Sequence, residues 1–360
     1  MTKLKRVLIM AGGTGGHVFP GLAAAHFFRG RGVDVHWLGT SQGLEAKVIP
    51  AEKIPLHFIT ISGLRGKGIK ALLTAPLRII QAVLEARKII AELKPDVVIG
   101  MGGFASGPGG VASWLAGCPL VIHEQNAKAG LTNKILANFA KRVLQGFPGA
   151  FKQSQKVITI GNPVRFEIEN IPAPETRLAA DRKPFRLLVL GGSLGAKALN
   201  ELVPRTLAKL SSDIRPEVWH QTGEKHFEDT KSLYESTGIR ANLVPFVKDM
   251  AEVYSWADMV LCRAGALTVA ELCAAGLGAV FVPFPHAVDD HQTANADFMV
   301  KQNAALCVQQ KDLTEDRLAD IVEQFALSPF KRIEMAQAAF RLRQIHVTEK
   351  IYDICEEISR

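Results

Sequence analysis

Three glycine-rich loops, each beside a short apolar segment, constrain this chain more than any other feature. They occupy residues 12–17, 100–110 and 191–196. Glycine lets the backbone come close to a phosphate or a sugar, with N–H groups turned inward at the start of a helix. A single loop of this kind is as often a tight turn without a ligand, but three of them favour ligand binding.

Short apolar segments alternate with longer segments in which apolar residues recur at helical spacing, as in residues 77–93. The predicted strands of the first half are residues 7–10, 33–38, 57–61, 97–100, 120–123 and 157–160. Those of the second half are residues 186–190, 217–221, 243–245, 259–262 and 279–282. This alternation predicts an α/β fold in which helices cover both faces of parallel sheets.

The length of 360 residues suits two domains. A turn sequence at Gly161-Asn162-Pro163 precedes a poorly patterned stretch, residues 170–183, which indicates a hinge or linker. We therefore expect one domain over residues 1–163 and another over 164–340. A final amphipathic helix over residues 340–358 can pack on either domain, and segment 341–360 is a candidate addition to the first.

Charge is distributed unevenly. Through Arg165 there are 21 Lys and Arg against 7 Asp and Glu, whereas the rest of the chain has 22 against 28. A basic first half indicates an anionic partner for that half, either nucleic acid or an anionic membrane surface. The basic residues are not interleaved with stacking aromatic residues, and no nucleic-acid-binding motif is present, so we expect no nucleic acid partner.

The remaining composition is that of a globular protein, with 48% hydrophobic and 22% charged residues. Five scattered cysteines without a CxxC pair predict a reduced, cytosolic protein without a structural zinc site. No apolar run approaches the roughly 20 residues that span a bilayer, and the N-terminus reads as a short basic lead into a strand rather than a signal peptide.

The loops do not fit two common nucleotide-binding classes. A nicotinamide dinucleotide fold needs a carboxylate at the end of its second strand, where this chain has Trp37-Leu38-Gly39-Thr40. A P-loop needs Gly-Lys-Ser/Thr, which no loop contains.

The second half offers a different nucleotide anchor, where a strand gives way to a helix over residues 263–271. Backbone N–H groups of Ala266, Leu267 and Thr268 would point at a diphosphate, and Glu271 could accept hydrogen bonds from two ribose hydroxyls. Ser193 could donate to the same diphosphate from the facing loop. The alternative is that Glu271 only favours the start of its helix.

Longer motifs run in order along almost the whole chain. They are GGTGGHVFPGLA from residue 12, GMGGFASGPGG from 100, HEQN from 123, AGLTNK from 129, GNPVR from 161, GGSLGA from 191, CRAGALTVAE from 262 and DDHQTANA from 289. On these motifs the chain resembles the MurG family, bacterial UDP-N-acetylglucosamine transferases that act on lipid I in peptidoglycan synthesis. The resemblance implies the GT-B architecture, two Rossmann-like domains with parallel sheets facing across a cleft, and a reaction without cofactor or bound metal.

The resemblance also implies which residues bind the donor, UDP-N-acetylglucosamine, with the first domain receiving lipid I. The matching positions are Thr14, Gly15, Gly16, Asn126, Arg165, Ser193, Val247, Ala266, Leu267, Thr268, Val269, Ala270, Glu271 and Gln292. Among these, Val247 matches the position that reads uracil and Gln292 a contact to the sugar. Other positions depart from the family pattern: Leu194 replaces a common glutamine, Phe104 replaces a common tyrosine, and Ala127 and Lys128 also differ.

The implied reaction is inverting transfer of N-acetylglucosamine to the 4-hydroxyl of N-acetylmuramic acid in lipid I, which forms lipid II. One displacement needs one base, and His17 is the candidate, since a neutral imidazole suits proton removal near neutral pH. His17 could instead only hydrogen-bond a loop carbonyl or the acceptor. Glu124 and His123 are rival candidates, with structural hydrogen bonding as their alternative. No DxD motif is present, and we expect no metal at Asp289-Asp290.

Residues 64–80 mix basic and apolar side chains, a composition typical of an interfacial membrane segment, which Lys134, Lys141 and Arg142 can extend. The alternative is an ordinary core helix with solvated lysines. The resemblance places such a protein peripherally on the cytoplasmic face of the inner membrane, with other cell-wall enzymes as partners. Alternative functions are a UDP-N-acetylglucosamine 2-epimerase and a non-catalytic UDP-sugar sensor.

Overall fold

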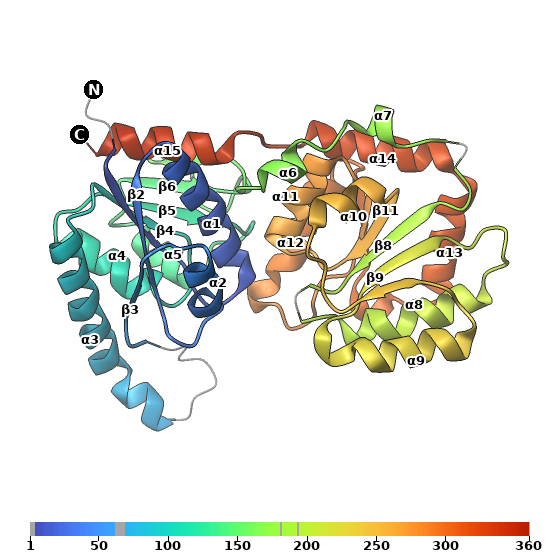
Figure 1. Ribbon diagram of the computed structural model, residues 1–360, viewed down its shortest axis with the longest axis horizontal. Helices are drawn as coiled ribbons and strands as arrows, with labels where there is room; N and C mark the ends of the chain where they lie inside the picture. The colour runs from blue at the N-terminus through green and yellow to red at the C-terminus, as the bar shows by residue number, and fades with distance from the viewer. Residues whose placement is uncertain (1–3, 62–68, 181, 193, 360) are drawn as a thin grey trace. The chain divides into compact units, whose positions relative to one another are not determined.

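The computed structural model describes residues 4–61, 69–180, 182–192 and 194–359. They form two compact units, each built on its own parallel sheet (Figure 1). The first unit comprises Met1–Pro163 and His346–Arg360, and the second comprises Val164–Ile345. The sequence prediction of an α/β fold with parallel sheets is confirmed.

The first unit contains a seven-stranded sheet with the order β3-β2-β1-β4-β5-β6-β7, in which every neighbouring pair is parallel. The strands are β1 (Arg6–Met10), β2 (Asp34–Gly39), β3 (Leu56–Phe58), β4 (Val97–Gly100), β5 (Leu120–Glu124), β6 (Arg142–Gln145) and β7 (Val157–Thr159). The helices are α1 (Gly15–Gly30), α2 (Glu45–Ala51), α3 (Ile69–Leu93), α4 (Ser106–Leu115), α5 (Leu131–Leu136) and α15 (Val347–Ile358).

Helices cover both faces of this sheet. Val7 and Ile9 of β1 pack in one cluster with α1 and α15, whereas Leu8 and Met10 pack in another with α3 and α4. The rings of Phe28 and Tyr352 lie 5.4 Å apart, which fastens α15 to α1 (Figure 1). Because both faces are covered, the central strands are buried along nearly their whole length, as expected for a parallel sheet.

The second unit contains a six-stranded parallel sheet with the order β10-β9-β8-β11-β12-β13. Its strands are β8 (Arg186–Leu190), β9 (Glu217–Gln221), β10 (Asn242–Val244), β11 (Met259–Cys262), β12 (Ala279–Phe281) and β13 (Ala305–Cys307). Its helices are α6 (Phe166–Glu169), α7 (Pro174–Arg177), α8 (Lys197–Lys209), α9 (Phe227–Thr237), α10 (Met250–Trp256), α11 (Ala266–Ala275), α12 (His291–Val300), α13 (Glu315–Leu327) and α14 (Pro329–Arg341).

Two arginine side chains hold the poorly patterned stretch after Pro163 to the second unit, and one of them, Arg182, donates to Oδ1 of Asp258 at 2.5 Å. The Arg177 guanidinium donates to the carbonyl oxygens of Ala257, Ala275 and Gly276 at 2.8–3.0 Å. These carbonyls lie at the ends of α10 and α11, where backbone acceptors have no partner within the helix. Arg177 and Arg182 therefore supply the anchoring that the sequence pattern does not reveal.

One predicted helix is wrong in its extent. Residues 340–358 do not form a continuous helix, because α14 ends at Arg341 and α15 begins at Val347. His346 between them has a φ of 57°, in the left-handed region, which interrupts the right-handed helix. Strands β6 and β13 were not predicted.

The sheet orders determine where the loops meet. Strand β1 lies between β2, the next strand along the chain, and β4, which pairs with its other edge. Strand β8 likewise lies between β9, the next strand, and β11. Ligands in open α/β sheets bind at such switch points, beyond the carboxyl ends of the strands. The three glycine-rich loops follow β1, β4 and β8, and α11 follows β11.

Within the described ranges, no helix combines the length and the hydropathy that a membrane span requires.

Candidate functional site

The first two glycine-rich loops contact each other directly. Gly103 has a φ of +84°, and a Cβ atom there would lie 2.2 Å from the carbonyl oxygen of Gly12. Only glycine permits this conformation together with this approach of two backbones. The two loops therefore form one surface at the switch point between β1 and β4.

His17 lies on this surface, in the first turn of α1 rather than at the end of the loop. Its Nδ1 atom is 3.4 Å from Oγ1 of Thr14. Its ring packs against Gly102, where a Cβ atom would lie 2.5 Å from Cδ2 of His17. The second loop thus limits where the imidazole can sit, and the ring remains partly exposed, as do Thr14, Gly15 and Gly16.

A buried carboxylate that sequence reasoning missed supports the first loop. Glu45 is 0% exposed and accepts hydrogen bonds from the N–H of Gly13 at 2.9 Å and from the N–H and hydroxyl of Thr40 at 2.9 and 2.8 Å. Gly39 and Gly43 leave room for its side chain, since a Cβ atom at either would collide with it. Gly39 and Gly43, which both precede Glu45, were the sequence feature from which this buried carboxylate could have been predicted.

Glu124 of β5 is buried and accepts four hydrogen bonds. They come from the N–H and side-chain amide of Asn126 at 3.0 and 3.2 Å, the N–H of Gly130 at 3.0 Å and the amide of Asn133 at 2.9 Å. A carboxylate offers about four acceptor positions, so these contacts occupy it fully. The geometry favours the structural alternative for Glu124, which holds the loop carrying Asn126.

His123 is also hydrogen-bonded within the protein. Its Nε2 atom lies 2.9 Å from the carbonyl oxygen of Gly161, to which it must donate, and burial lowers the pKa of His123. Gln125 donates to the carbonyl oxygen of Met101 at 2.9 Å, and so connects the loop after β5 to the second glycine-rich loop. Three loops of the first unit are therefore joined at one edge of the sheet.

In the second unit, α11 begins at that sheet's switch point. Gly265 at the N-cap has an extended backbone, and no side chain caps the helix among the described residues. The first N–H groups of an α-helix have no partner within it, which leaves those of Ala266, Leu267 and Thr268 directed beyond the helix start. Together with the helix dipole, this arrangement favours an anion there.

Glu271, in the second turn of α11, has two hydrogen-bond partners among the described residues. Arg165, at the N-cap of α6, donates to Oε1 at 2.9 Å, and the hydroxyl of Tyr254 donates to Oε2 at 3.0 Å. The structure thus brings together two of the predicted donor residues, Arg165 and Glu271, and adds Tyr254, which the sequence did not indicate. The hydroxyl stays protonated because burial, and secondly the charge of Glu271, raises the pKa of Tyr254 well above its ordinary value.

The third glycine-rich loop packs on the end of β9. Gly195 has a φ of +77°, and a Cβ atom there would lie 2.0 Å from the carbonyl oxygen of Thr222. The amide of Asn200 donates to that same carbonyl oxygen at 2.9 Å. Ser193, the predicted diphosphate contact, lies outside the described residues, and Leu194 beside it is 79% exposed.

Asn200 belongs to a buried chain of polar groups. Its Oδ1 atom accepts from Nε2 of His220 at 3.0 Å, and Nδ1 of His220 accepts from the hydroxyl of Tyr234 at 3.0 Å. Burial lowers the pKa of His220 to about 3, so the imidazole is neutral. The chain fixes the carbonyl of Thr222 on which the third loop rests.

Val247 lies in the loop after β10, and Gln292 lies in α12, which follows β12. Val247 is 6% exposed and comes just after β10. Oε1 of Gln292, in α12, accepts from the N–H of Phe284 at 2.8 Å. Two further residues that were not predicted hold this region: Arg263 donates to the carbonyl of Val282 at 2.9 Å, and Asn295 donates to that of Ala264 at 3.1 Å.

The predicted donor residues thus belong to both units. Thr14, Gly15, Gly16 and Asn126 belong to the first, whereas the other described ones belong to the second. Among the residues that the structure describes, no group of three or more His, Cys, Asp or Glu could hold a metal ion.

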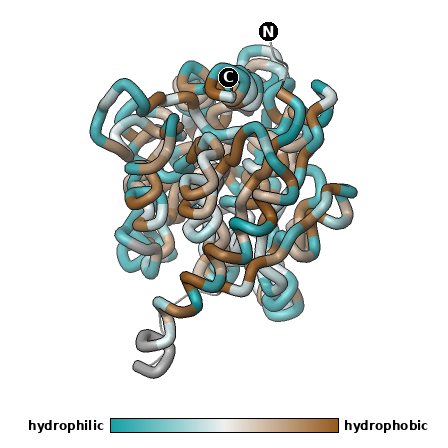
Figure 2. Tube along the Cα trace, turned by 90° about the vertical axis from the view of Figure 1, so that its left-hand side faces the viewer, coloured by the Kyte–Doolittle hydropathy of each residue, from teal (hydrophilic) through white to brown (hydrophobic). Residues whose placement is uncertain are grey.

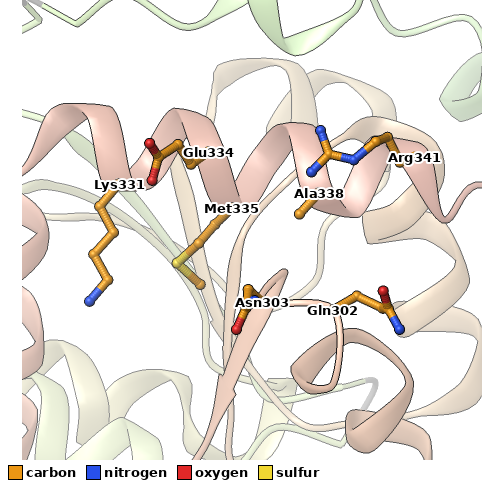
Figure 3. A pocket seen from close by; sticks show the side chains of 7 residues that line it. All are labelled: Gln302, Asn303, Lys331, Glu334, Met335, Ala338 and Arg341. Carbon is orange, nitrogen blue, oxygen red and sulfur yellow. The ribbon is translucent and has the colours of Figure 1, made fainter.

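A pocket of about 340 Å³ lies elsewhere in the second unit (Figure 3). Its walls come from α14 and from the turn after α12, through Gln302, Asn303, Lys331, Glu334, Met335, Ala338 and Arg341. Figure 3 shows Lys331 and Arg341 toward opposite ends of the row on α14. The turn precedes β13, so the pocket is at the amino-terminal end of that strand, whereas the third glycine-rich loop follows the carboxyl end of β8.

Comparison with known proteins agrees with this geometry. Residues 7–145 match the glycosyltransferase family 28 N-terminal domain, and residues 186–357 match the family 28 C-terminal domain. Two parallel α/β units with these matches define a glycosyltransferase.

Similar proteins specify the family further. A UDP-N-acetylglucosamine–N-acetylmuramyl-(pentapeptide) pyrophosphoryl-undecaprenol N-acetylglucosamine transferase of Marinobacter nauticus is 52% identical, over 98% of this chain and 97% of that one. Its counterpart in Pseudomonas entomophila is 51% identical over 99% and 98%. The crystal structure of Acinetobacter baumannii MurG covers 98% of this chain and 99% of its own, with a TM-score of 0.84 and 40% identity. The chain belongs to the MurG family.

The alternative enzyme is a more distant neighbour. A UDP-N-acetylglucosamine 2-epimerase matches with a TM-score of 0.65 and 13% identity, and the Neisseria meningitidis enzyme with 0.68 and 11%. Identities this low show a shared fold only.

Proposed function

We propose that this chain transfers N-acetylglucosamine from UDP-N-acetylglucosamine to the 4-hydroxyl of N-acetylmuramic acid in lipid I, forming lipid II and UDP. The observation that carries this proposal is the 52% identity over nearly the full length of a transferase whose name states this donor and this acceptor. The glycine-rich surfaces at the switch points of both sheets support it, because each offers a site for a phosphate-bearing ligand.

The second unit provides most of the donor contacts in this proposal. N–H groups of Ala266, Leu267 and Thr268, together with Ser193, hold the diphosphate, while Glu271 holds the ribose. Val247 contacts uracil through its backbone, and Gln292 contacts the sugar. Val269, Ala270, Thr14, Gly15, Gly16 and Asn126 complete the predicted donor contacts.

In the reaction, the 4-hydroxyl oxygen bonds to the anomeric carbon as the bond from that carbon to the UDP oxygen breaks, so the configuration is inverted. His17 accepts the hydroxyl proton, with its ring oriented by Thr14 and limited by Gly102. Because the four hydrogen bonds to Glu124 occupy its oxygens, we assign it the role of holding the Asn126 loop.

Negative charge that develops on the departing UDP is stabilised by the start of α11 and by Arg165. Preorganised N–H groups and a guanidinium can take the part that a metal ion plays in other transferases. We therefore propose that transfer needs no bound metal.

The acceptor is a lipid, and we propose that the first unit meets the membrane through a surface that we call the apolar patch. It consists of exposed side chains on three helices: Leu77, Ile80 and Leu84 of α3, Trp114 and Leu115 of α4, and Leu131 and Ile135 of α5. Hydrophobic residues along α3 are visible in Figure 2. Residues 64–68 of the predicted interfacial segment lie outside the described residues.

Basic side chains accompany the apolar patch. Arg78, Lys134 and Lys141 are exposed on or beside the same helices. Apolar side chains with basic residues around them are typical of a surface that binds an anionic membrane interface, where each basic residue contributes about 1 kcal/mol. This supports peripheral association with the cytoplasmic face of the inner membrane.

Transfer of radiolabelled N-acetylglucosamine from UDP to a synthetic lipid I analogue tests the proposed function. We expect a labelled lipid product with wild-type protein and a strongly reduced yield with Glu271→Ala. If the donor is converted to its 2-epimer without any labelled lipid, the epimerase is the correct function instead.

A further inference from the structure

Tyr254 contacts the residue on which the proposed ribose site depends. Its hydroxyl donates to Oε2 of Glu271 at 3.0 Å, from α10 to α11. We propose that Tyr254 is a positioning residue that holds the Glu271 carboxylate in place for the ribose hydroxyls, and so gives the second unit its preference for a ribonucleotide. This inference rests on the proposed function, in which Glu271 holds the ribose.

The two oxygens of Glu271 are held from different elements. Arg165 donates to Oε1 at 2.9 Å and Tyr254 donates to Oε2, so the orientation of the carboxylate plane is fixed at both ends. Since a carboxylate has about four acceptor positions, each oxygen retains capacity for one further donor. The side chain of Glu271 is 13% exposed, which leaves it accessible to a ligand. Two adjacent hydroxyls, as on a ribose, match two held acceptors.

Tyr254 is the more rigid of the two partners. It is 1% exposed, whereas the side chain of Arg165 is 43% exposed. Helix α10 is itself fixed, because Asp249 caps its start by accepting from the N–H of Glu252 at 3.1 Å. A buried side chain on a fixed helix keeps its geometry when the ligand leaves, whereas an exposed arginine can move.

The hydroxyl is also a constant donor. Burial and the nearby charge of Glu271 raise the pKa of Tyr254 well above its ordinary value, so the hydroxyl is protonated near neutral pH. A phenylalanine would keep the ring packing and remove only this donor. Loss of the donor would leave Oε2 without its protein partner and allow the carboxylate to turn.

Calorimetric titration of wild-type and Tyr254→Phe protein with UDP and with 2′,3′-dideoxy-UDP tests the inference. The dideoxy analogue lacks both hydroxyls that Glu271 would hold. We expect Tyr254→Phe to weaken UDP binding about tenfold, in the range of a lost hydrogen bond to a charged group, and dideoxy-UDP binding less than about twofold. In transfer assays the KM for the donor should rise while kcat changes little. Tyr352→Phe, in α15 of the first unit, is the matched control and should bind both nucleotides like the wild type.

A double-mutant cycle with Glu271→Ala separates positioning from general damage. If Tyr254 acts through Glu271, then Tyr254→Phe has no further effect on UDP affinity in the Glu271→Ala background. Equal losses for UDP and dideoxy-UDP, or additive losses in the cycle, would overturn the inference. Failure of the proposed function looks different, because the wild-type protein would then transfer no sugar to the lipid I analogue.

Discussion

At the scale of single residues, the site consists of a few reactive groups and a larger set of residues that hold them. His17 and Glu271 are the groups to which we assign chemistry and binding. Thr14 and Gly102 constrain the first, and Arg165 and Tyr254 constrain the second. Polar contacts of this kind determine how accurately a reacting group is placed.

Replacement of His17 by Ala tests the base directly. We expect kcat to fall by roughly 10²–10⁴-fold, the usual contribution of general base catalysis. UDP affinity should be unchanged, because the diphosphate is held by the second unit. Steady-state transfer kinetics with a UDP titration measure both quantities. A variant with near-normal turnover and normal binding would remove His17 from this role.

The residues missed by sequence reasoning are those that act on other residues. Tyr254 and Glu45 both lie in helices. Tyr254 contacts Glu271, which is 17 residues away in the sequence, and Glu45 contacts Gly13, which is 32 residues away. Only folding brings such groups within 3 Å of each other. The glycine-rich loops could be recognised because each is a continuous segment whose backbone requirement is written in adjacent residues.

A pH prediction follows from His220 of β9. Its folded pKa of about 3 is lower than the value of an unfolded histidine, near 6.5, so below pH 6.5 the unfolded chain binds a proton that the folded chain does not. The contribution of His220 to the free energy of unfolding therefore decreases as pH falls from about 6.5 toward 3, by about 1.4 kcal/mol per pH unit. Between pH 7 and pH 5, the free energy of unfolding should fall by about 2 kcal/mol less in His220→Gln than in the wild type, as measured by denaturant unfolding. Parallel pH dependences would contradict the assignment.

At the scale of elements, the sequence identified most of the strands, including three-residue strands such as β7 and β10, but it missed two. Strands β1, β4, β8 and β11 are continuous apolar runs at the sheet centres, and the sequence identified all four. Strands β6 and β13 are short, with four and three residues, and were missed. Their backbones are extended because a neighbouring strand provides hydrogen-bond partners, and such tertiary effects leave little pattern in a short segment.

The sequence also did not predict where helix α3 begins or what its apolar face contacts. It begins at Ile69 although only residues 77–93 have a clear amphipathic pattern. Leu77, Ile80 and Leu84 are 56–71% exposed, on a face that none of the described residues covers. Apolar periodicity predicts a helix but does not tell whether the apolar face contacts protein or membrane.

Replacement of Leu77, Ile80 and Leu84 by Ser tests the apolar patch. We expect binding to vesicles that contain anionic phospholipid to fall at least about tenfold, because each buried leucine or isoleucine contributes about 1.5–3 kcal/mol. UDP affinity should not change. The matched control replaces Leu327 and Phe330 of the second unit, which are 65% and 72% exposed, and should bind vesicles normally. Co-sedimentation that is unaffected by the triple change, or indifferent to lipid charge and salt, would contradict the membrane role.

At the scale of the whole molecule, charge and proposed function divide in the same way. The half of the chain through Arg165 has 21 basic against 7 acidic residues and carries the proposed membrane surface, whereas the half that carries most of the donor site has 22 against 28. Electrostatic attraction to an anionic surface therefore acts on the unit that would receive the lipid acceptor.

Removal of metal ions tests how the leaving UDP is stabilised. If the start of α11 and Arg165 stabilise its charge, transfer in excess chelator should proceed at the same rate as in Mg²⁺ or Mn²⁺. The rate of UDP release is the quantity to compare. A loss of activity in chelator that a divalent ion restores would show that a metal takes part.

Amide hydrogen exchange with and without UDP most directly tests the claim that the second unit binds the donor through α11. We predict slower exchange on UDP binding at Ala266, Leu267 and Thr268 and in the loop of residues 191–196. The same protection should be much weaker in Glu271→Ala at equal UDP concentration. Unchanged exchange at the start of α11 in saturating UDP, or protection confined to the first unit, would contradict the proposed donor site.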